Sequence, residues 1–189
     1  MVMSCHSQRL LVDRVELNTA GIIRQADRYL EREPLPITNF PATRSAGGIH
    51  DFYSEGDYWW PDPDGPYIRR DGQTNPENFI AHREAMRDLS RWVANLVAAF
   101  KITGDEKYAK QALKHLNAWF VNPDTRMYPS LLYAQAIKGV VSGRGIGIID
   151  TIHLIEVAKS IQELDRLGYL SDADFSNLRN WFDQYVTWL

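Results

Sequence analysis

Apolar residues recur every three or four positions over several long stretches of the chain, which is the spacing of an amphipathic α-helix. The pattern predicts helices over about residues 12–33, 76–102, 106–120, 148–167 and 172–189. No stretch shows the strict alternation of a half-buried β-strand, so the predicted fold class is all-α.

Residues with special backbone preferences mark the predicted helix ends. Pro34 ends the first helix, because proline has no backbone N–H donor and restricts the residue before it. Asn75 is the expected N-cap of the second helix, and Pro76 suits its first position. Gly104 is expected to close this helix and Asp105 to cap the next. Two antiparallel helices joined by so short a turn form a helical hairpin.

Short turns alternate with long connections over about residues 34–75 and 122–147. The first connection is rich in proline, glycine and aromatic residues. Long loops in compact domains are usually functional or disordered, and disordered segments are poor in aromatics, so an ordered functional loop is predicted. The pattern is typical of stacked helical hairpins, here an incomplete α/α toroid of paired antiparallel helices. The long loops are expected on one face, with the functional site among them.

Each end of the chain carries its own signal. Residues 12–189 are predicted to be the N-terminal part of a toroid domain, after a tail over residues 1–11. Residues 2–5 (Val-Met-Ser-Cys) resemble the end of a bacterial lipoprotein signal, although a chance start sequence is the alternative. The last predicted helix reaches Trp188 and Leu189 without Gly, Asn, Pro or a basic last turn, which predicts that the domain is truncated there.

Composition excludes several classes of function. The net charge of −3 gives no basic excess for nucleic acid, and no stretch approaches the ~20 apolar residues of a membrane span. The single cysteine, Cys5, excludes an internal disulfide framework and a cysteine-rich zinc site. No spaced His, Asp and Glu set resembles a zinc or calcium site, so neither a metal nor a cofactor is predicted. Many aromatic residues cluster between Phe52 and Phe79, where flat rings with polar edges suit sugars.

From about residue 45 onward the chain carries a set of distinctive motifs. They are Gly-Asp-Tyr-Trp-Trp-Pro-Asp-Pro at 56–63, Pro-Tyr-Ile-Arg-Arg-Asp-Gly at 66–72, Asn-Pro-Glu at 75–77 and Gly-Arg-Gly-Ile-Gly-Ile-Ile-Asp at 143–150, with further support at 103–109 and 133–135. This set resembles the N-terminal portion of the bacterial alginate lyase family. The resemblance implies an α/α toroid whose cleft binds an acidic polysaccharide, alginate or a related uronate polymer. It also implies a periplasmic or secreted protein, with a lipid anchor as a further option.

The resemblance implies β-elimination without an obligatory metal. Neutralising the uronate carboxylate acidifies the C5 proton, which a base removes while an acid protonates the departing O4. In the family an Asn-His pair, followed by Arg and Tyr, performs these steps, shortly after a helix that resembles residues 180–189. No histidine here follows two asparagines. We therefore expect no catalytic residues in this chain, which alone is predicted to form part of the cleft and not to turn over alginate.

Eight residues of the two connections are predicted to bind substrate. They are Tyr58, Trp59, Trp60, Arg69, Arg70, Tyr133, Gln135 and Arg144. The rings either stack on sugars or pin the loop, and the guanidinium fork suits carboxylates unless nearby aspartates occupy it. Gln135 either binds a sugar or braces its loop, and Arg144 either points into the cleft or pairs with Asp150. His50, beside Asp51, is a further candidate whose alternative is a structural hydrogen bond.

Two other classes of function stay open. A glycoside hydrolase on a similar toroid needs two carboxylates flanking the bond. The nominees are Glu55, Asp62, Asp64 and Asp150. A non-catalytic helical module that binds carbohydrate or a partner is the other class. The isolated histidines His82, His115 and His153 are expected on the surface or in the core. The proposed substrate cleft exists only if the segments around Trp59 and Arg144 meet at one end of the molecule.

Overall fold

The computed structural model describes residues 19–189. Its long helices are α2 (Ala81–Thr103), α3 (Glu106–Phe120), α4 (Leu154–Arg166) and α5 (Asp172–Trp188), with 3-10 helices η1 (Ile37–Asn39) and η2 (Gly145–Thr151). Its strands are β1 (Tyr53–Glu55), β2 (Trp59–Asp62), β3 (Gly65–Arg69) and β4 (Tyr133–Ala136). Of the first predicted helix, residues 19–27 are helical and 28–31 form turns. Its start, the predicted tail and the resemblance to a lipoprotein signal lie outside the described residues.

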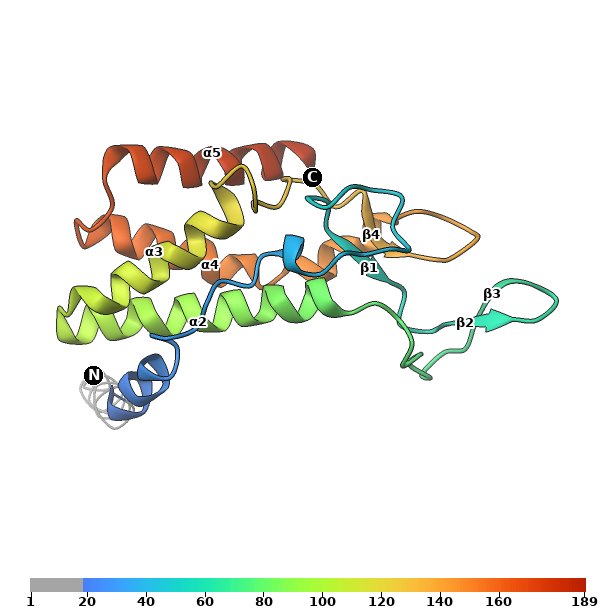
Figure 1. Cartoon of the computed structure of the whole chain (residues 1–189), viewed down its shortest axis with the longest axis horizontal. Helices are drawn as coiled ribbons and strands as arrows, with labels where there is room; N and C mark the ends of the chain where they lie inside the picture. Colours follow the sequence, from blue (N-terminus) through green and yellow to red (C-terminus); the bar gives the residue numbers. More distant parts are fainter. Residues whose placement is uncertain (1–18) are drawn as a thin grey trace, which may run out of the picture.

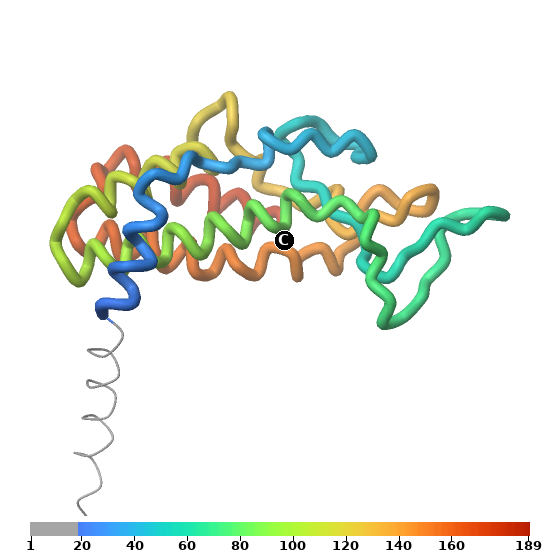
Figure 2. The backbone as a smooth tube through the Cα atoms, turned by 60° about the horizontal axis from the view of Figure 1, so that its bottom comes forward, coloured from blue at the N-terminus to red at the C-terminus, as the bar shows by residue number. Residues whose placement is uncertain are grey.

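The long helices run along the longest axis of the molecule, and the strands and long loops gather at one end (Figure 1). Helix α2 packs against both α3 and α4, and α5 packs against α3 and α4. The short turns between α2 and α3 and between α4 and α5 lie at the opposite end, and the tube view shows the same separation (Figure 2). The predicted helical hairpins and the shared position of the long loops are therefore confirmed. Closure into a toroid stays a prediction.

Local capping explains the helix ends that sequence predicted correctly. Gly104 adopts the left-handed conformation at φ 70° and donates its backbone N–H to the carbonyl of Phe100. The Asp105 side chain caps α3 by accepting from the backbone N–H of Lys107, at 3.1 Å. Ser171 caps α5 in the same way. These short-range signals place both ends of the α2–α3 turn as expected.

Two helix starts differ from the prediction because the residues before them serve the loops. Helix α2 begins at Ala81, five residues after the predicted start. Asn75 instead accepts from the backbone N–H of Glu77 and donates to the carbonyl of Trp59, at 3.0 Å each. Helix α4 begins at Leu154, since Gly145–Thr151 forms the 3-10 helix η2. The predicted cap and the predicted first turn of α4 are thus parts of the loop end.

The prediction of a purely α-helical fold was wrong in one respect, because the described chain includes two small sheets. Strand β1 pairs in parallel with β4, with Tyr53 opposite Tyr133. Strands β2 and β3 form an antiparallel hairpin in which Trp59 lies opposite Arg69. Each strand has only three to five residues, too few to show a readable alternation of apolar and polar positions.

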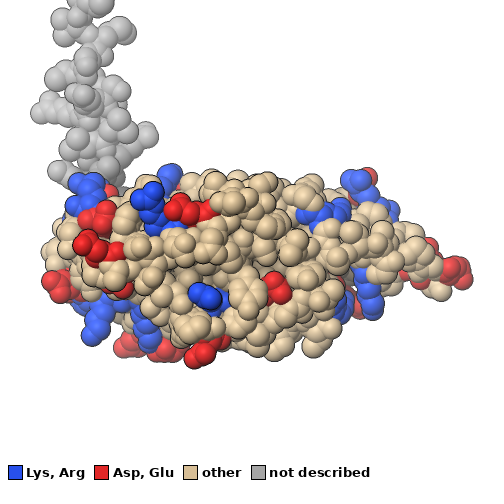
Figure 3. Space-filling model, turned by 90° about the horizontal axis from the view of Figure 1, so that it is seen from above, with Lys and Arg blue, Asp and Glu red and all other residues tan. Residues whose placement is uncertain are grey.

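The core lies between the helices and extends under the loops. Its largest fully buried side chains include Phe52, Met86, Leu89, Leu96, Leu116, Trp119, Phe120, Leu164 and Leu178. Helix α5 joins this core through Trp181, whose indole N–H donates to the carbonyl of Met127 at 2.6 Å. Seen from above, charged side chains gather toward the two ends of the molecule and are sparse over the middle (Figure 3).

Candidate functional site

A cavity of about 410 Å³ opens at the loop end, between the two long connections and α2. We call it the arginine cavity. Its lining residues are Asp57, Tyr58, Trp59, Arg69, Arg83, Arg87, Gln135, Arg144, Ile146, Ile149, Asp150 and His153. Trp59 and Arg144 therefore lie at the same end of the molecule, which is the arrangement that the proposed substrate cleft requires.

Gly56 lies where the two connections meet. A Cβ atom on this residue would lie 2.7 Å from both Nη2 of Arg144 and Cδ1 of Trp59, closer than real Cβ atoms approach other atoms. The absence of a side chain lets these two groups occupy neighbouring positions. Two hydrogen bonds fix the backbone of Gly56: Asn78 donates to its carbonyl at 2.8 Å, and its own N–H donates to the carbonyl of Ala136.

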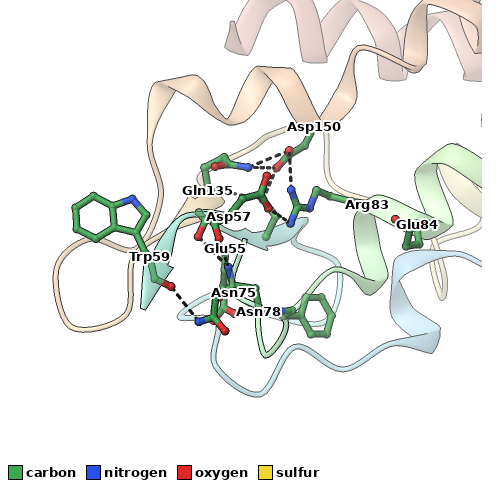
Figure 4. Close-up of polar contacts among 12 residues, drawn as sticks. Glu55, Asp57, Trp59, Asn75, Asn78, Arg83, Glu84, Gln135 and Asp150 are labelled. Atoms are coloured by element: carbon green, nitrogen blue, oxygen red, sulfur yellow. Dashed lines mark hydrogen bonds and ion pairs between the residues drawn. The ribbon is translucent and has the colours of Figure 1, made fainter. Parts of the chain in front are cut away.

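Arg83 of α2 ties both connections to the helical body. Its Nη2 donates to Asp57 of the first connection at 2.6 Å, and its Nη1 lies 3.7 Å from Asp150 of the second. Figure 4 shows this guanidinium between the two carboxylates, with the amide of Gln135 directed at Asp150. Burial lowers the pKa of Arg83, but the hydrogen bond to Asp57 and the charge of Asp150 more than offset it, so the pKa lies above its ordinary value. The site thus rests on ion pairs around one buried guanidinium.

Gln135 occupies a backbone conformation that few non-glycine residues adopt, with φ at 55°. Its backbone N–H donates to the hydroxyl of Ser54 at 2.8 Å, and its side-chain amide donates to Asp150 at 3.0 Å. Its two oxygens face Arg144: the carbonyl accepts from Nε at 2.7 Å and Oε1 from Nη2 at 3.1 Å. Gln135 therefore holds the guanidinium of Arg144 in place, which supports the loop-bracing alternative.

Arg144 approaches the cavity from a segment held close to β4. A Cβ on Gly143 would collide with the carbonyl of Leu132, and one on Gly147 would lie 2.5 Å from the Cβ of Ala134. The link between Arg144 and Asp150 is indirect and runs through Gln135. Burial lowers the pKa of Arg144, and the positive charge of Arg69 lowers it further. Two cations thus face the same cavity.

The alginate lyase family model matches residues 37–189. The chain belongs to the alginate lyase family. A solved structure described as an alginate lyase from Bacteroides ovatus is 36% identical, with a TM-score of 0.82. The alignment covers 90% of this chain and 46% of that one, so the chain spans less than half the length of this relative. A search of curated proteins gives no significant match.

The structure divides the predicted sugar-binding residues of this lyase-family chain into two groups. Tyr58, Trp59, Arg69, Gln135 and Arg144 line the arginine cavity. The others belong to local contacts outside its lining. The division separates Trp59 from Trp60 on β2, because adjacent residues of a strand point to opposite faces.

The hairpin β2–β3 illustrates the division. Trp60 donates its indole N–H to the carbonyl of Gln73 at 2.8 Å, and the guanidinium of Arg70 lies 5.3 Å from the centre of the Trp60 ring. The Trp60 hydrogen bond ties the hairpin to the segment after it, as the loop-pinning alternative expects, and the exposed Arg70 only covers the Trp60 ring. Arg69 lines the cavity and pairs with the exposed Asp71 at 2.5 Å.

Tyr133 and His50 also lie outside the cavity lining. The ring of Tyr133 packs so closely on Gly47 that a Cβ there would lie 2.5 Å from two ring carbons. His50 donates its Nδ1 proton to the carbonyl of Arg126 at 2.7 Å and its ring packs against Tyr128. Both contacts support structural roles for these residues.

Sequence reasoning missed Arg83, Arg87 and His153 as cavity residues. Arg83 and Arg87 are four residues apart on α2 and therefore share a face, which is a signal that the sequence contains. His153 is half-buried at the surface, in line with the expectation, but it also lines the cavity, which the sequence did not indicate. His82 is a core residue as expected: Nδ1 accepts from the backbone N–H of Tyr53 and Nε2 donates to Phe40, while burial lowers its pKa.

The described part of the chain shows neither a metal-binding cluster nor a helix suited to a membrane. Within residues 19–189, no group of three or more His, Cys, Asp or Glu side chains is arranged to hold a metal ion. Over the same residues, no helix combines the length and apolar character needed to cross a membrane.

Proposed function

We propose that the arginine cavity binds a uronate residue of an alginate-like polysaccharide, within a protein that cleaves such polymers by β-elimination. The carrying observation is that Arg69 and Arg144 face one cavity while its acidic residues are already engaged. Family membership favours a polysaccharide lyase, and an acidic polysaccharide is the substrate class that this charge pattern suits. A periplasmic or secreted location follows as part of the same proposal, and cell fractionation tests it.

The charge balance of the cavity favours an anionic ligand. Four arginines line it, Arg69, Arg83, Arg87 and Arg144, against two acids, Asp57 and Asp150. Both acids contact Arg83, and Arg87 pairs with Glu84 outside the lining. The charges of Asp57 and Asp150 also act on Arg144, but neither acid contacts Arg69 or Arg144 directly, so these two guanidiniums remain available to an anion. The pair between Arg69 and Asp71 is exposed and therefore contributes little, so a substrate carboxylate can replace Asp71. The cavity is a site where a carboxylate is attracted.

Carboxylate binding is chemically useful to a lyase. A guanidinium can donate two parallel hydrogen bonds to a carboxylate, which withdraws charge from it. The C5–H bond beside a neutralised carboxylate is more acidic, so a base can remove the proton while O4 departs. The rings of Tyr58 and Trp59 offer apolar faces for the sugar next to these cations. In the proposed division of roles, these residues bind and orient substrate, and the family's Asn-His pair is not part of this chain.

Hydrolysis by two carboxylates is the alternative, and the contacts weigh against it. A glycosidase needs a free acid and a free base or nucleophile on either side of the bond. Asp57 and Asp150 are held by Arg83, and Glu55 is buried against Tyr53, Phe79 and Arg44. Asp62 and Asp64 lie on the hairpin outside the cavity lining. None of these acids forms an unengaged pair across the cavity.

Neighbouring arginines provide a matched test of the proposal. Calorimetric titration with a mannuronate trisaccharide should show binding that Arg69→Ala weakens about tenfold, because a charge-assisted hydrogen bond is lost. Arg70→Ala changes the same residue type on the same hairpin but outside the cavity, and should leave the dissociation constant within about twofold. Equal losses in both variants would contradict binding in this cavity. In a protein with activity, the ultraviolet absorbance of an unsaturated uronate product separates elimination from hydrolysis.

A further inference from the structure

Asp150 is a buried carboxylate that contacts three partners from three different elements. It is 8% exposed and lies in η2. Its carboxylate accepts hydrogen bonds from the hydroxyl of Ser54 on β1 and from the side-chain amide of Gln135 on β4. It also forms an ion pair with Arg83 of α2. Both of its oxygens are within 3.1 Å of the Gln135 amide nitrogen. A carboxylate buried in this way orients whatever donors surround it.

The contact with Asp150 fixes which way the Gln135 amide points. An ionised carboxylate only accepts hydrogen bonds and a guanidinium only donates them. With its NH₂ toward Asp150 and its oxygen toward Arg144, the Gln135 amide satisfies both neighbours. The flipped amide would aim oxygen at oxygen on one side and N–H at N–H on the other. Asp150 therefore determines that an acceptor faces Arg144.

The backbone of Gln135 is part of the same arrangement. The left-handed conformation of a non-glycine residue costs about 1–3 kcal/mol and persists only where surrounding contacts hold it. Those contacts are the bond from its N–H to Ser54 and the bond from its amide to Asp150. The conformation turns the Gln135 carbonyl toward Nε of Arg144, at 2.7 Å.

Arg144 has its backbone held independently of this network. Its N–H donates to the carbonyl of Ala134 at 2.9 Å, and the glycines at 143 and 147 allow the close approach to β4. What remains to be set is the direction of the guanidinium. Gln135 takes the Nε proton and one Nη2 proton, which leaves the other edge of the guanidinium for a ligand in the cavity.

We propose that Asp150 is a positioning residue, which acts through Gln135 to aim the guanidinium of Arg144 at the carboxylate of a bound uronate. Gln135 is accordingly a relay between a buried acid and a ligand-binding cation. The proposal rests on the proposed function for the identity of the ligand. The orientation of Arg144 is a property of the free protein and can be measured without any ligand.

The test combines a spectroscopic readout with a double-mutant cycle. In ¹H–¹⁵N spectra, the Nε–H signal of Arg144, assigned by its loss in Arg144→Met, should shift and exchange faster with solvent in Asp150→Asn. Affinity for a mannuronate trisaccharide should fall about tenfold in Asp150→Asn but by less than about twofold when Arg144→Met is already present, since coupled residues show such non-additivity. Asp64→Asn, on the hairpin outside the cavity lining, is the matched control and should change neither readout.

Each outcome decides the proposal. An unchanged Arg144 signal in Asp150→Asn overturns it, and so does an equal loss of affinity with and without Arg144, since that is the result of a general structural effect. If Asp150→Asn does not fold, Gln135→Met removes the relay alone and must give the same shift of the Arg144 signal. If the wild-type chain binds no uronate, the proposed function fails while the Arg144 signal still supports or refutes the positioning role.

Discussion

The arginine cavity and a neighbouring apolar groove meet at Ile149 but are built in opposite ways. The cavity is held by hydrogen bonds and ion pairs among side chains from α2, η2 and both long connections. The groove, about 500 Å³ in volume, runs between η2, α4 and the end of α5. Its lining residues are Ile148, Ile149, Thr151, Ile152, Leu154, Ile155, Ala158, Phe182, Tyr185, Val186 and Leu189.

The difference shows what each kind of surface specifies. Polar groups in the cavity have directional partners, so one arrangement is selected. Apolar residues of the groove are largely exposed: Ile149 by 59%, Ile152 by 58% and Val186 by 67%. Contiguous apolar surface of this kind marks an interaction or aggregation surface without defining a single partner. The cavity can therefore select a ligand by its polar groups, while the groove favours any apolar surface that covers it.

The largest expected effect comes from removing the central ion pair of the cavity. Arg83→Met leaves Asp57 and Asp150 without their buried counter-ion, so the free energy of unfolding should fall by about 3–5 kcal/mol. Arg87→Met, one helical turn later, removes only an exposed pair with Glu84 and should cost about 0–1 kcal/mol. Denaturant unfolding measures both. Equal losses would contradict the claim that the cavity is held by a directional network.

A second effect locates acid sensitivity in the helical body and not in the cavity. Burial, and then the charge of Lys114, lowers the pKa of His115 to about 4. The unfolded state binds this proton more readily, so stability is complete above about pH 6.5 and is lost as the pH falls toward 4. The loss should be on the order of 3 kcal/mol, and His115→Gln should remove most of it. A pH profile of unfolding that is the same in His115→Gln would refute this assignment.

Gly56 tests the contact between the two connections. In Gly56→Ala the new methyl group displaces the guanidinium of Arg144 and the ring of Trp59, so affinity for a uronate trisaccharide should fall about tenfold and the free energy of unfolding by about 1–3 kcal/mol. Gly65→Ala is the matched control, because nothing lies within 4 Å of a Cβ there. Unchanged binding in Gly56→Ala would show that these two side chains do not act together on the ligand.

The smallest effect on stability is expected in the groove. Ile152→Lys combined with Ile155→Glu replaces exposed apolar side chains and should change the free energy of unfolding by less than about 0.5 kcal/mol each. The same pair should reduce self-association of the purified chain, measured by sedimentation, and leave ligand binding at the cavity unchanged. Self-association that persists in the double variant would show that the chain associates through another surface.

Sequence predicted the parts of this fold that depend on short-range signals. Helix α3 has the expected bounds because Gly104 and Asp105 fix its start by local hydrogen bonds. The start of α2 was misplaced because Asn75, a good helix cap, instead braces Trp59 from sixteen residues away. That competition between a local and a distant partner is decided by tertiary structure, which a pattern of residue types does not contain.

The candidate site was predicted in part for the same reason. Loop motifs identified Trp59, Arg69 and Arg144 as cavity residues, since aromatic and guanidinium groups have chemical uses wherever they lie. Nothing in a helical pattern separates a buried Arg83 from an exposed arginine, because its burial depends on two aspartates from distant connections. The orientation of Gln135 depends likewise on a pairing across fifteen residues.

The central claim is that the cavity recognises the negative charge of a uronate. Titration of the intact chain with a mannuronate trisaccharide and with its methyl ester tests this most directly, because the two ligands share their shape but differ in charge. The predicted result is that esterification weakens binding at least tenfold and that added salt weakens only the acid form. Equal affinity for the acid and the ester would contradict the account.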